Sequence, residues 1–286
     1  MTFQEELERG AFPVALEITP PQQPLPAVLL RRARLLGTAA CAVNVIQRPG
    51  RQTSLQASCV LASAGVQPAW HLVTRGRTHA DILADLRVAA AAGVQQVLCI
   101  RGDHVGPDQP GAPTIREATA LAVEHLPGAY AGATLNQYGD DVQAVRKNLE
   151  GKIKAGAAYV QTQPVFAIED SWPALEWLRE RWPATRVVAM AMPLLTEDAA
   201  AKIEARLGIA LPPSLRRAIA GGEGAAWECF TETLAGLAAS PLVDGVAIMT
   251  FEMDPAAATG ERIVACLRAA KTGLSGRSPA GTTIGP

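Results

Sequence analysis

Eight short apolar runs alternate with longer segments of helical periodicity from residue 13 almost to residue 270. This alternation is typical of successive βα units and a parallel sheet. Most of the runs are continuously apolar, as expected for strands that are covered on both faces. The eight predicted strands are 13–18, 41–46, 69–73, 96–101, 130–136, 159–165, 186–192 and 245–250.

Eight parallel strands, each followed by a helix, predict an α/β fold: a (β/α)8 TIM barrel in a single domain. The length of 286 residues fits, because such barrels commonly reach about 250 residues. The barrel domain is expected over 1–270. Its seventh βα unit is enlarged by two helical patterns, 197–207 and 213–239. Residues 271–286 are rich in Gly, Ser, Thr and Pro and are expected to form a disordered tail.

Charge and composition narrow the class of protein. The net charge is −1 and basic residues are scattered, which argues against a nucleic-acid partner. No apolar run approaches the roughly 18 residues of a membrane span, and the first residues lack the basic and apolar regions of a secretion signal. The five cysteines are widely spaced and are interpreted as buried thiols in a reducing compartment. We therefore expect a cytoplasmic protein with a small-molecule substrate and no membrane partner.

Polar side chains recur where the predicted strands end. The active site of a βα barrel is assembled at the carboxyl ends of its strands, so these side chains are expected to converge on one mouth. They are Glu17, Asn44, His71, Arg101, Asp103, Asn136, Gln161, Gln163 and Glu252.

Glu17 is the strongest single candidate. It interrupts an apolar strand directly before Thr19 and two prolines. A carboxylate buried there costs several kcal/mol unless it is paired or protonated. Burial would raise its pKa and suit it to general acid catalysis near neutrality. The alternative is a structural carboxylate bonded to an Arg or His of a neighbouring strand.

Other motifs are less specific. Gly102, between Arg101 and Asp103, would let the backbone approach a ligand closely, although a loop salt bridge is the alternative. His71 by itself is more often a core residue than a catalyst. The sequence has no dinucleotide-binding glycine fingerprint, no Walker loop and no His/Cys cluster with metal-ligand spacing. No metal site is therefore predicted, and any cofactor would bind at the barrel mouth.

Taken in order, these motifs form a recognisable series. They are LEITPP (16–21), WHL (70–72), IRGD (100–103), and KIKAGA (152–157) leading to QTQP (161–164). In this order and spacing the chain resembles the methylenetetrahydrofolate reductase family, especially its short bacterial forms, from about residue 5 to residue 270. The resemblance implies a TIM barrel that reduces 5,10-methylenetetrahydrofolate to 5-methyltetrahydrofolate.

The resemblance also implies roles for individual residues. Glu17 would be the acid that protonates N10 of the folate, and Asp103 the second catalytic residue, a carboxylate between pterin and flavin. Gln163 would bind the pterin, together with Glu17 and Asp103. The flavin-binding positions would be Asn44, His71, Ile100, Arg101, Gly102, Asp103, Asn136 and Lys152, with Arg101 and Lys152 beside the diphosphate.

The cofactor and the partners follow from the same resemblance. FAD is the expected cofactor; FMN, or no flavin with hydride taken directly from NADH or NADPH, is the alternative. Two positions depart from the family pattern on the flavin side: Ile46 replaces a threonine, and Asn136 falls near an expected tyrosine. An aspartate expected on the helix after Asn136, and the arginine that would hold a substrate carboxylate after strand 8, have no clear counterpart.

Folate is the expected substrate, and a nicotinamide or a partner protein is the expected electron donor. Self-association into a homo-oligomer is compatible with this interpretation. A barrel methyltransferase or lyase that uses a pterin without redox chemistry is a competing hypothesis. A non-catalytic folate-binding barrel subunit of a larger complex is another.

Overall fold

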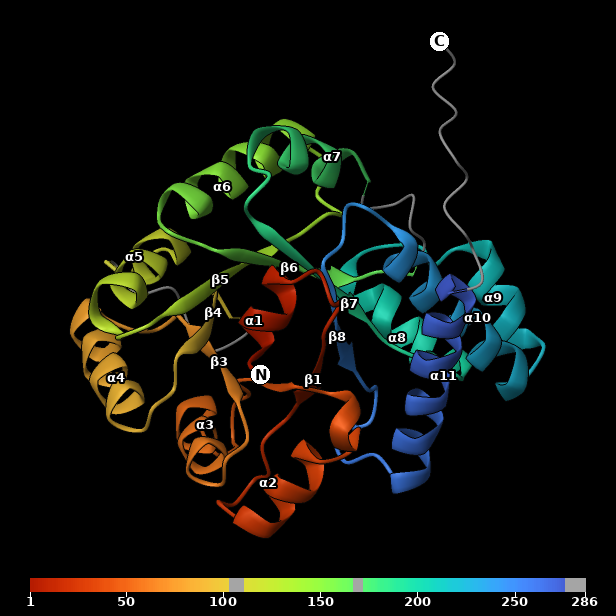
Figure 1. The fold of residues 1–286 in the computed structure, drawn as a ribbon, viewed down its shortest axis with the longest axis horizontal. Helices are drawn as coiled ribbons and strands as arrows, with labels where there is room; N and C mark the ends of the chain where they lie inside the picture. Colours follow the sequence, from red (N-terminus) through yellow and green to blue (C-terminus); the bar gives the residue numbers. More distant parts are fainter. Residues whose placement is uncertain (103–110, 167–171, 276–286) are drawn as a thin grey trace.

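The structure is a computed structural model, and it describes residues 1–102, 111–166 and 172–275. Eight parallel strands form a closed barrel in sequence order, with β1 hydrogen-bonded to both β2 and β8 (Figure 1). Every predicted strand is confirmed to within one residue at each end. The strands are β1 (Val14–Ile18), β2 (Ala42–Val45), β3 (Pro68–Val73), β4 (Gln96–Ile100), β5 (Tyr130–Leu135), β6 (Tyr159–Pro164), β7 (Arg186–Ala191) and β8 (Gly245–Met249).

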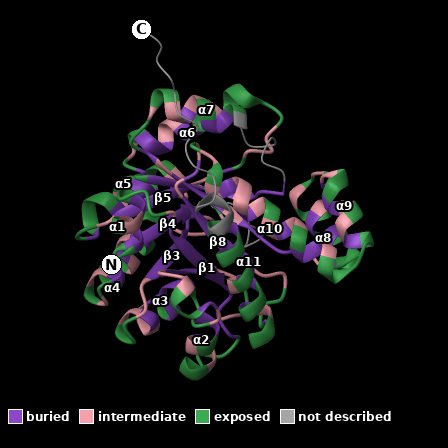
Figure 2. Cartoon of the chain, turned by 45° about the vertical axis from the view of Figure 1, so that its right-hand side comes forward, coloured by how far each residue is buried: buried purple, intermediate pink, exposed green. Residues whose placement is uncertain are grey.

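Helices form a ring outside the strands, with their polar faces exposed and their apolar faces buried against the barrel (Figure 2). The helices are α1 (Phe3–Glu8), α2 (Pro26–Ala33), the 3₁₀ turn η1 (Gly37–Ala39), α3 (Ser54–Ser63), α4 (His79–Ala91), α5 (Ile115–His125), α6 (Val142–Lys154), α7 (Trp172–Arg181), α8 (Glu197–Leu207), α9 (Pro213–Ala220), α10 (Glu223–Ala239) and α11 (Ala257–Ser275).

Local sequence signals explain where several of these helices start. Thr78 precedes α4, and its hydroxyl accepts a hydrogen bond from the backbone N–H of Asp81. The Asp81 carboxylate accepts one from the N–H of Thr78 in return. Such a reciprocal cap satisfies two backbone donors that the helix itself leaves free. The same arrangement starts α1, α3 and α5.

The enlarged seventh unit contains three helices. The pattern over 213–239, expected to be one helix, is instead divided into α9 and α10, so that expectation was wrong. Gly221 and Gly222 separate the two helices, and Gly222 has a φ of 98°, which glycine adopts without steric strain. α10 packs against α11, α9 and β7 and completes the outer ring, and α8 and α9 share an apolar cluster with the first turns of α10.

Two further expectations need correction. Helix α11 continues through Ser275, so the first five residues of the stretch expected to be a tail are helical. Of the five cysteines, only Cys99 and Cys266 are buried; the other three are half-buried because they lie on helices or at a strand end near the surface. Within the described ranges, no helix is both long and apolar enough to span a lipid bilayer.

The interior of the barrel is mostly apolar at its amino-terminal end. Helix α1 closes this end by placing Phe3 and Leu7 against small and aromatic side chains of the strands. Tyr130 and Tyr159 stack there with ring centroids 5.0 Å apart. Gly132 makes room for them, since a Cβ at this position would lie 2.2 Å from the Tyr159 ring. Gln96, the first residue of β4, is a buried polar side chain at this end and hydrogen-bonds Tyr159.

Candidate active site

A layer of buried polar side chains fills the barrel interior near the carboxyl ends of the strands. Glu17, Asn44, His71 and Gln161 are each at most 6% exposed. Their strand neighbours, such as Leu16, point the other way and pack under the helices. This alternation follows from the period of two in a β-strand. The sequence-based expectation that these strand-end residues converge is thus confirmed for the four residues.

A chain of hydrogen bonds links three of the four. Nδ2 of Asn44 donates to Oε1 of Gln161 at 2.8 Å, and Nε2 of Gln161 donates to Oε2 of Glu17 at 2.9 Å. Glu17 and Asn44 are partners in the β1–β2 register. Gln161 lies on β6, four strands from β2 in an eight-stranded barrel, so its side chain reaches across the interior.

The environment of Glu17 favours its neutral form. Burial raises the pKa of the carboxyl group to about 7. Hydrogen bonds from the amides of Gln161 and Asn44 oppose this shift, as do the nearby positive charges of Arg206 and Arg48. Because the hydrogen-bond partners are amides rather than an Arg or His, the proton stays available near neutral pH. This is the property required of a general acid.

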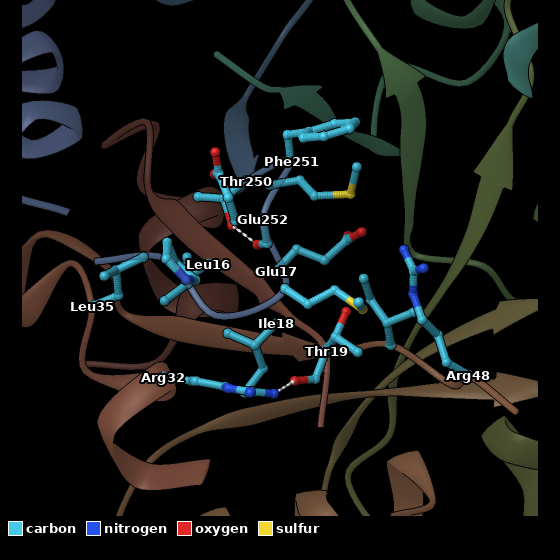
Figure 3. A pocket seen from close by; sticks show the side chains of 14 residues that line it. Leu16, Glu17, Ile18, Thr19, Arg32, Leu35, Arg48, Thr250, Phe251 and Glu252 are labelled. Carbon is cyan, nitrogen blue, oxygen red and sulfur yellow. Dashed lines mark hydrogen bonds between the residues drawn. The ribbon is translucent and has the colours of Figure 1, made fainter. Parts of the chain in front are cut away.

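A small pocket of about 20 Å³ opens beside Glu17, between the ends of β1, β2 and β8. The Glu17 carboxyl group points into it, toward the side where Arg48 lies (Figure 3). Phe251 and Glu252 line its other side. Ile46 also lines this pocket, at the position where the resemblance implies a threonine.

A second, larger cavity of about 570 Å³ lies beside β3, β4, α5 and α6. Its lining carries four basic side chains: Arg75, Arg101, Arg116 and Lys152. Such a concentration of positive charge suits a phosphate or diphosphate group. Arg101 and Lys152 were singled out from the sequence. Arg75 and Arg116 were not, because neither belongs to a recognised motif.

Lys152 reaches this cavity from the buried side of α6. Its Nζ donates a 2.6 Å hydrogen bond to the carbonyl oxygen of Thr134 on β5. Burial lowers the pKa of the ammonium group to about 8. A neighbouring cavity of about 260 Å³ is lined by both Lys152 and Asn136. Asn136 is exposed, and its Oδ1 accepts a hydrogen bond from the backbone N–H of Tyr138.

The segment after β4 requires glycine. Gly102 has a φ of +86°, and a Cβ on it would lie 2.4 Å from Cγ1 of Val73 on β3. The backbone therefore passes directly over the end of the neighbouring strand. Ile100 is half-buried at the last position of β4, and Arg101 is exposed. Asp103, the second predicted catalytic residue, lies outside the residues that the structure describes.

His71 and Gln163 each have hydrogen-bonding groups without a protein partner among the described residues. Burial lowers the pKa of His71 to about 4, so its imidazole is neutral, and its buried Nε2 has no hydrogen-bond partner. Gln163 is half-buried and its backbone N–H and C=O both bond the side chain of Gln137. Its own amide makes no hydrogen bond with a described residue.

Gln161 is the residue whose role sequence reasoning missed. It was noted as a polar strand-end residue, but no function was given to it. Its signal is a glutamine inside the predicted strand 159–165. The pairing of β6 with β7 shifts register between Gln161 and Pro164, so spacing alone does not place Gln161 and Gln163 on one face. Within the described residues, no group of three or more His, Cys, Asp or Glu side chains is arranged to hold a metal ion.

Solved structures with a similar fold include two whose ligands are named. An uncharacterized protein from Clostridium thermocellum that binds two copies of 5-methyl-5,6,7,8-tetrahydrofolic acid is 13% identical, with a TM-score of 0.67 over 94% of this chain and 97% of that one. DHPS from Yersinia pestis with a pterine-sulfa conjugate is 15% identical, with a TM-score of 0.51 over 94% and 95% of the two chains. At these identities the likeness shows the fold.

Comparison by sequence gives a different kind of result. No curated protein matches the chain significantly. The sequence profile of the family described as methylenetetrahydrofolate reductase, however, matches residues 2–259. Because this match covers most of the 286 residues and the barrel is the one that the motif series implied, the protein belongs to the methylenetetrahydrofolate reductase family.

Proposed function

We propose that this protein reduces 5,10-methylenetetrahydrofolate to 5-methyltetrahydrofolate, with NADH or NADPH as the ultimate electron donor. Membership of the family supports the reaction. The fold that it shares with a Clostridium thermocellum protein that binds 5-methyl-5,6,7,8-tetrahydrofolic acid supports the class of substrate. In the reaction a hydride is added to the methylene carbon and one proton to N10, while the nicotinamide is oxidised.

The environment of Glu17 is the observation that carries this proposal. The bond from the methylene carbon to N10 breaks when N10 receives a proton, and the carbon is left as a cation with N5. Glu17 is buried at the barrel mouth and has a pKa of about 7, so it holds that proton at neutral pH. Once it has given up the proton, its negative charge is stabilised by the Gln161 N–H.

The cofactor we propose is FAD, and the residues present fit it. The cationic cavity beside Arg101 and Lys152 suits the diphosphate. Nε2 of His71, which has no hydrogen-bond partner among the described residues, offers a hydrogen bond to a polar group. Gly102 lets the backbone pass close over the end of β3, where a side chain would clash with Val73. Reduced flavin would supply the hydride. These residues would bind and orient it beside the folate.

Two substrate contacts are proposed from the motif series. The side-chain amide of Gln163 makes no hydrogen bond with a described residue, and its donor and acceptor suit a pterin edge. Asp103 keeps its proposed role as the carboxylate that favours the cationic folate intermediate. Neither assignment depends on the choice of electron donor.

A flavin-independent reductase is the second candidate, and one observation favours it. Ile46 lines the Glu17 pocket with an apolar side chain where the family pattern has a threonine on the flavin side. In that case the hydride would pass directly from NADH or NADPH to the folate. The absorption spectrum of the purified protein separates the candidates, since only a flavoprotein has bands in the flavin region.

The test of the reaction itself is an activity assay. We expect oxidation of NADH or NADPH that depends on methylenetetrahydrofolate, and oxidation of 5-methyltetrahydrofolate by an artificial electron acceptor. Absence of both activities with added flavin, either nicotinamide and saturating folate would contradict the proposal. Folate binding without turnover would instead support a non-catalytic subunit.

A further inference from the structure

The side chain of Gln161 is held at both ends inside the barrel. Its Oε1 accepts from Asn44 on β2, and its Nε2 donates to Glu17 on β1. All three side chains are at most 6% exposed, so water does not compete freely for these hydrogen bonds. The hydrogen bonds therefore run in one direction, from Asn44 through Gln161 to Glu17.

The direction matters because the two ends of an amide differ. An amide oxygen only accepts hydrogen bonds, and an amide nitrogen only donates them. Asn44 presents its Nδ2 to Gln161, and this donor requires the oxygen of Gln161 to face it. If the Gln161 amide turned by 180°, two N–H groups would face each other in a buried site. Asn44 therefore selects the orientation in which Gln161 presents N–H to Glu17.

We propose that Asn44 is a positioning residue that fixes the Gln161 amide with its N–H toward Glu17, and that this fixed amide controls how readily Glu17 releases its proton. An N–H donor favours the carboxylate. An amide oxygen in its place would accept from the protonated acid and favour the neutral form. The inference rests on the proposed function only where it concerns catalysis, in which Glu17 is the acid.

Other charged and titratable groups surround Glu17 and also affect its pKa. The positive charges of Arg48 and Arg206 lower its pKa, while burial raises it. Tyr159 lies beneath it on β6 and interacts with its charge. Glu252 lines the same pocket from the segment after β8. Among the described residues, Asn44 is the side chain that donates a hydrogen bond to the oxygen of the Gln161 amide.

The assignment also changes the role expected of Asn44. The sequence resemblance placed Asn44 among the flavin-binding residues. Its side-chain nitrogen is instead engaged with Gln161, and Asn44 is 2% exposed. We therefore expect replacement of Asn44 to alter the titration of Glu17 even in protein that contains no flavin.

The experiment follows the titration of Glu17 without any ligand. The side-chain carboxyl carbon of Glu17 is observed by NMR in ¹³C-labelled protein and is identified as the signal absent from Glu17→Gln. Its midpoint in the wild type is expected at about pH 7. In Gln161→Leu the midpoint should rise by about one pH unit, because the N–H donor is removed. In Asn44→Leu it should rise at least as far, because this change removes both the hydrogen bond from Asn44 to Glu17 and the partner that orients Gln161. Leucine has a similar size and keeps the interior filled.

Gln96→Leu is the matched control, since Gln96 is another buried glutamine of the barrel that makes no hydrogen bond with Glu17. It should leave the midpoint unchanged. In the double variant Asn44→Leu with Gln161→Leu, the rise should be smaller than the sum of the two single rises, because part of the effect of Asn44 passes through Gln161. Fully additive rises, or no rise in Asn44→Leu, would overturn the orienting role of Asn44. No rise in either variant would overturn the whole inference.

A measurement on the wild type covers the case in which a variant fails to fold. The side-chain NH₂ signal of Gln161 in ¹⁵N-labelled protein should shift with the same midpoint as Glu17, because its N–H bonds that carboxyl group. A shift with another midpoint, or none, would contradict the inference. Both measurements are made without folate, flavin or nicotinamide, so they stand even if the proposed reduction fails in the activity assay.

Discussion

Nε2 of Gln161, on β6, donates a 2.9 Å hydrogen bond to Oε2 of Glu17, on β1, across the interior of the barrel. The bond joins residues 144 positions apart in the sequence. This hydrogen bond stabilises the ionised Glu17 carboxylate, and because the donor is a neutral amide it adds no opposite charge. Glu17 can therefore both hold a proton at neutral pH and release it to a substrate.

Replacement of Glu17, the proposed acid, should largely abolish folate turnover without releasing bound flavin. In Glu17→Gln, folate turnover should fall by about 10²–10⁴-fold, because the amide cannot supply a proton. Any bound flavin should remain. The measurement is the rate of folate-dependent NAD(P)H oxidation together with the absorption spectrum. Glu124→Gln, which changes an exposed carboxylate on α5, is the control. Full activity in Glu17→Gln would show that another group is the acid.

The buried carboxyl group also predicts how stability depends on pH. The pKa of Glu17 is raised from 4.5 to about 7 in the folded state, so folding favours its protonated form. This contribution is fully present below about pH 4.5 and is lost as the pH rises to 7 and above. We expect the loss to be about 3 kcal/mol. Urea unfolding of the wild type and Glu17→Gln at pH 5 and pH 8 measures it. An equal pH dependence in both proteins would contradict this assignment.

The close approach of Gly102 to β3 predicts a steric penalty. In Gly102→Ala the new Cβ would lie 2.4 Å from Cγ1 of Val73, in a backbone with positive φ. The free energy of unfolding should fall by about 2–4 kcal/mol, from overpacking and backbone strain together. The double variant Gly102→Ala with Val73→Ala is compared with Val73→Ala alone. Relative to Val73→Ala, the double variant should lose only about 1–2 kcal/mol of the free energy of unfolding, which is the cost of the backbone strain. If the second change relieves nothing, the contact with Val73 is not the cause.

Lys152 predicts that binding of an anionic cofactor depends on pH. Its pKa is lowered to about 8 by burial, so the ammonium group loses its charge as the pH rises through that value. FAD should therefore bind more weakly at pH 9 than at pH 7, as measured by isothermal titration calorimetry. Lys152→Met should remove this difference. Arg101→Met is the matched comparison: it should weaken binding at both pH values and keep the difference, since a guanidinium group stays charged. If FAD still binds more weakly at pH 9 than at pH 7 in Lys152→Met, the pH dependence comes from a group other than Lys152.

Local features made the barrel predictable from the sequence. Eight continuous apolar runs marked the strands, and capping residues such as Thr78 marked helix starts. The break between α9 and α10 was missed because Gly221 and Gly222 lie inside a stretch whose apolar spacing is helical on both sides. Periodicity alone does not reveal that a glycine pair adopts a non-helical backbone.

The candidate site was predictable only in part. Glu17 could be found because a carboxylate within an apolar strand is unusual, and the order of the motifs indicated the family. The connection of Glu17 to Gln161 could not be found, because it depends on the closure of the barrel, which brings β6 opposite β1 and β2. The gathering of Arg75 and Arg116 around Lys152 likewise depends on how loops and helices pack.

The sequence by itself thus determined the eight strands, the fold class and the family, since these depend on periodicity and on motifs read along the chain. Only the tertiary structure decided which polar groups share the interior, which way the Gln161 amide points, and that Glu17 has a pKa near 7. The physical reason is that desolvation and hydrogen-bond direction are properties of side chains brought together from distant strands.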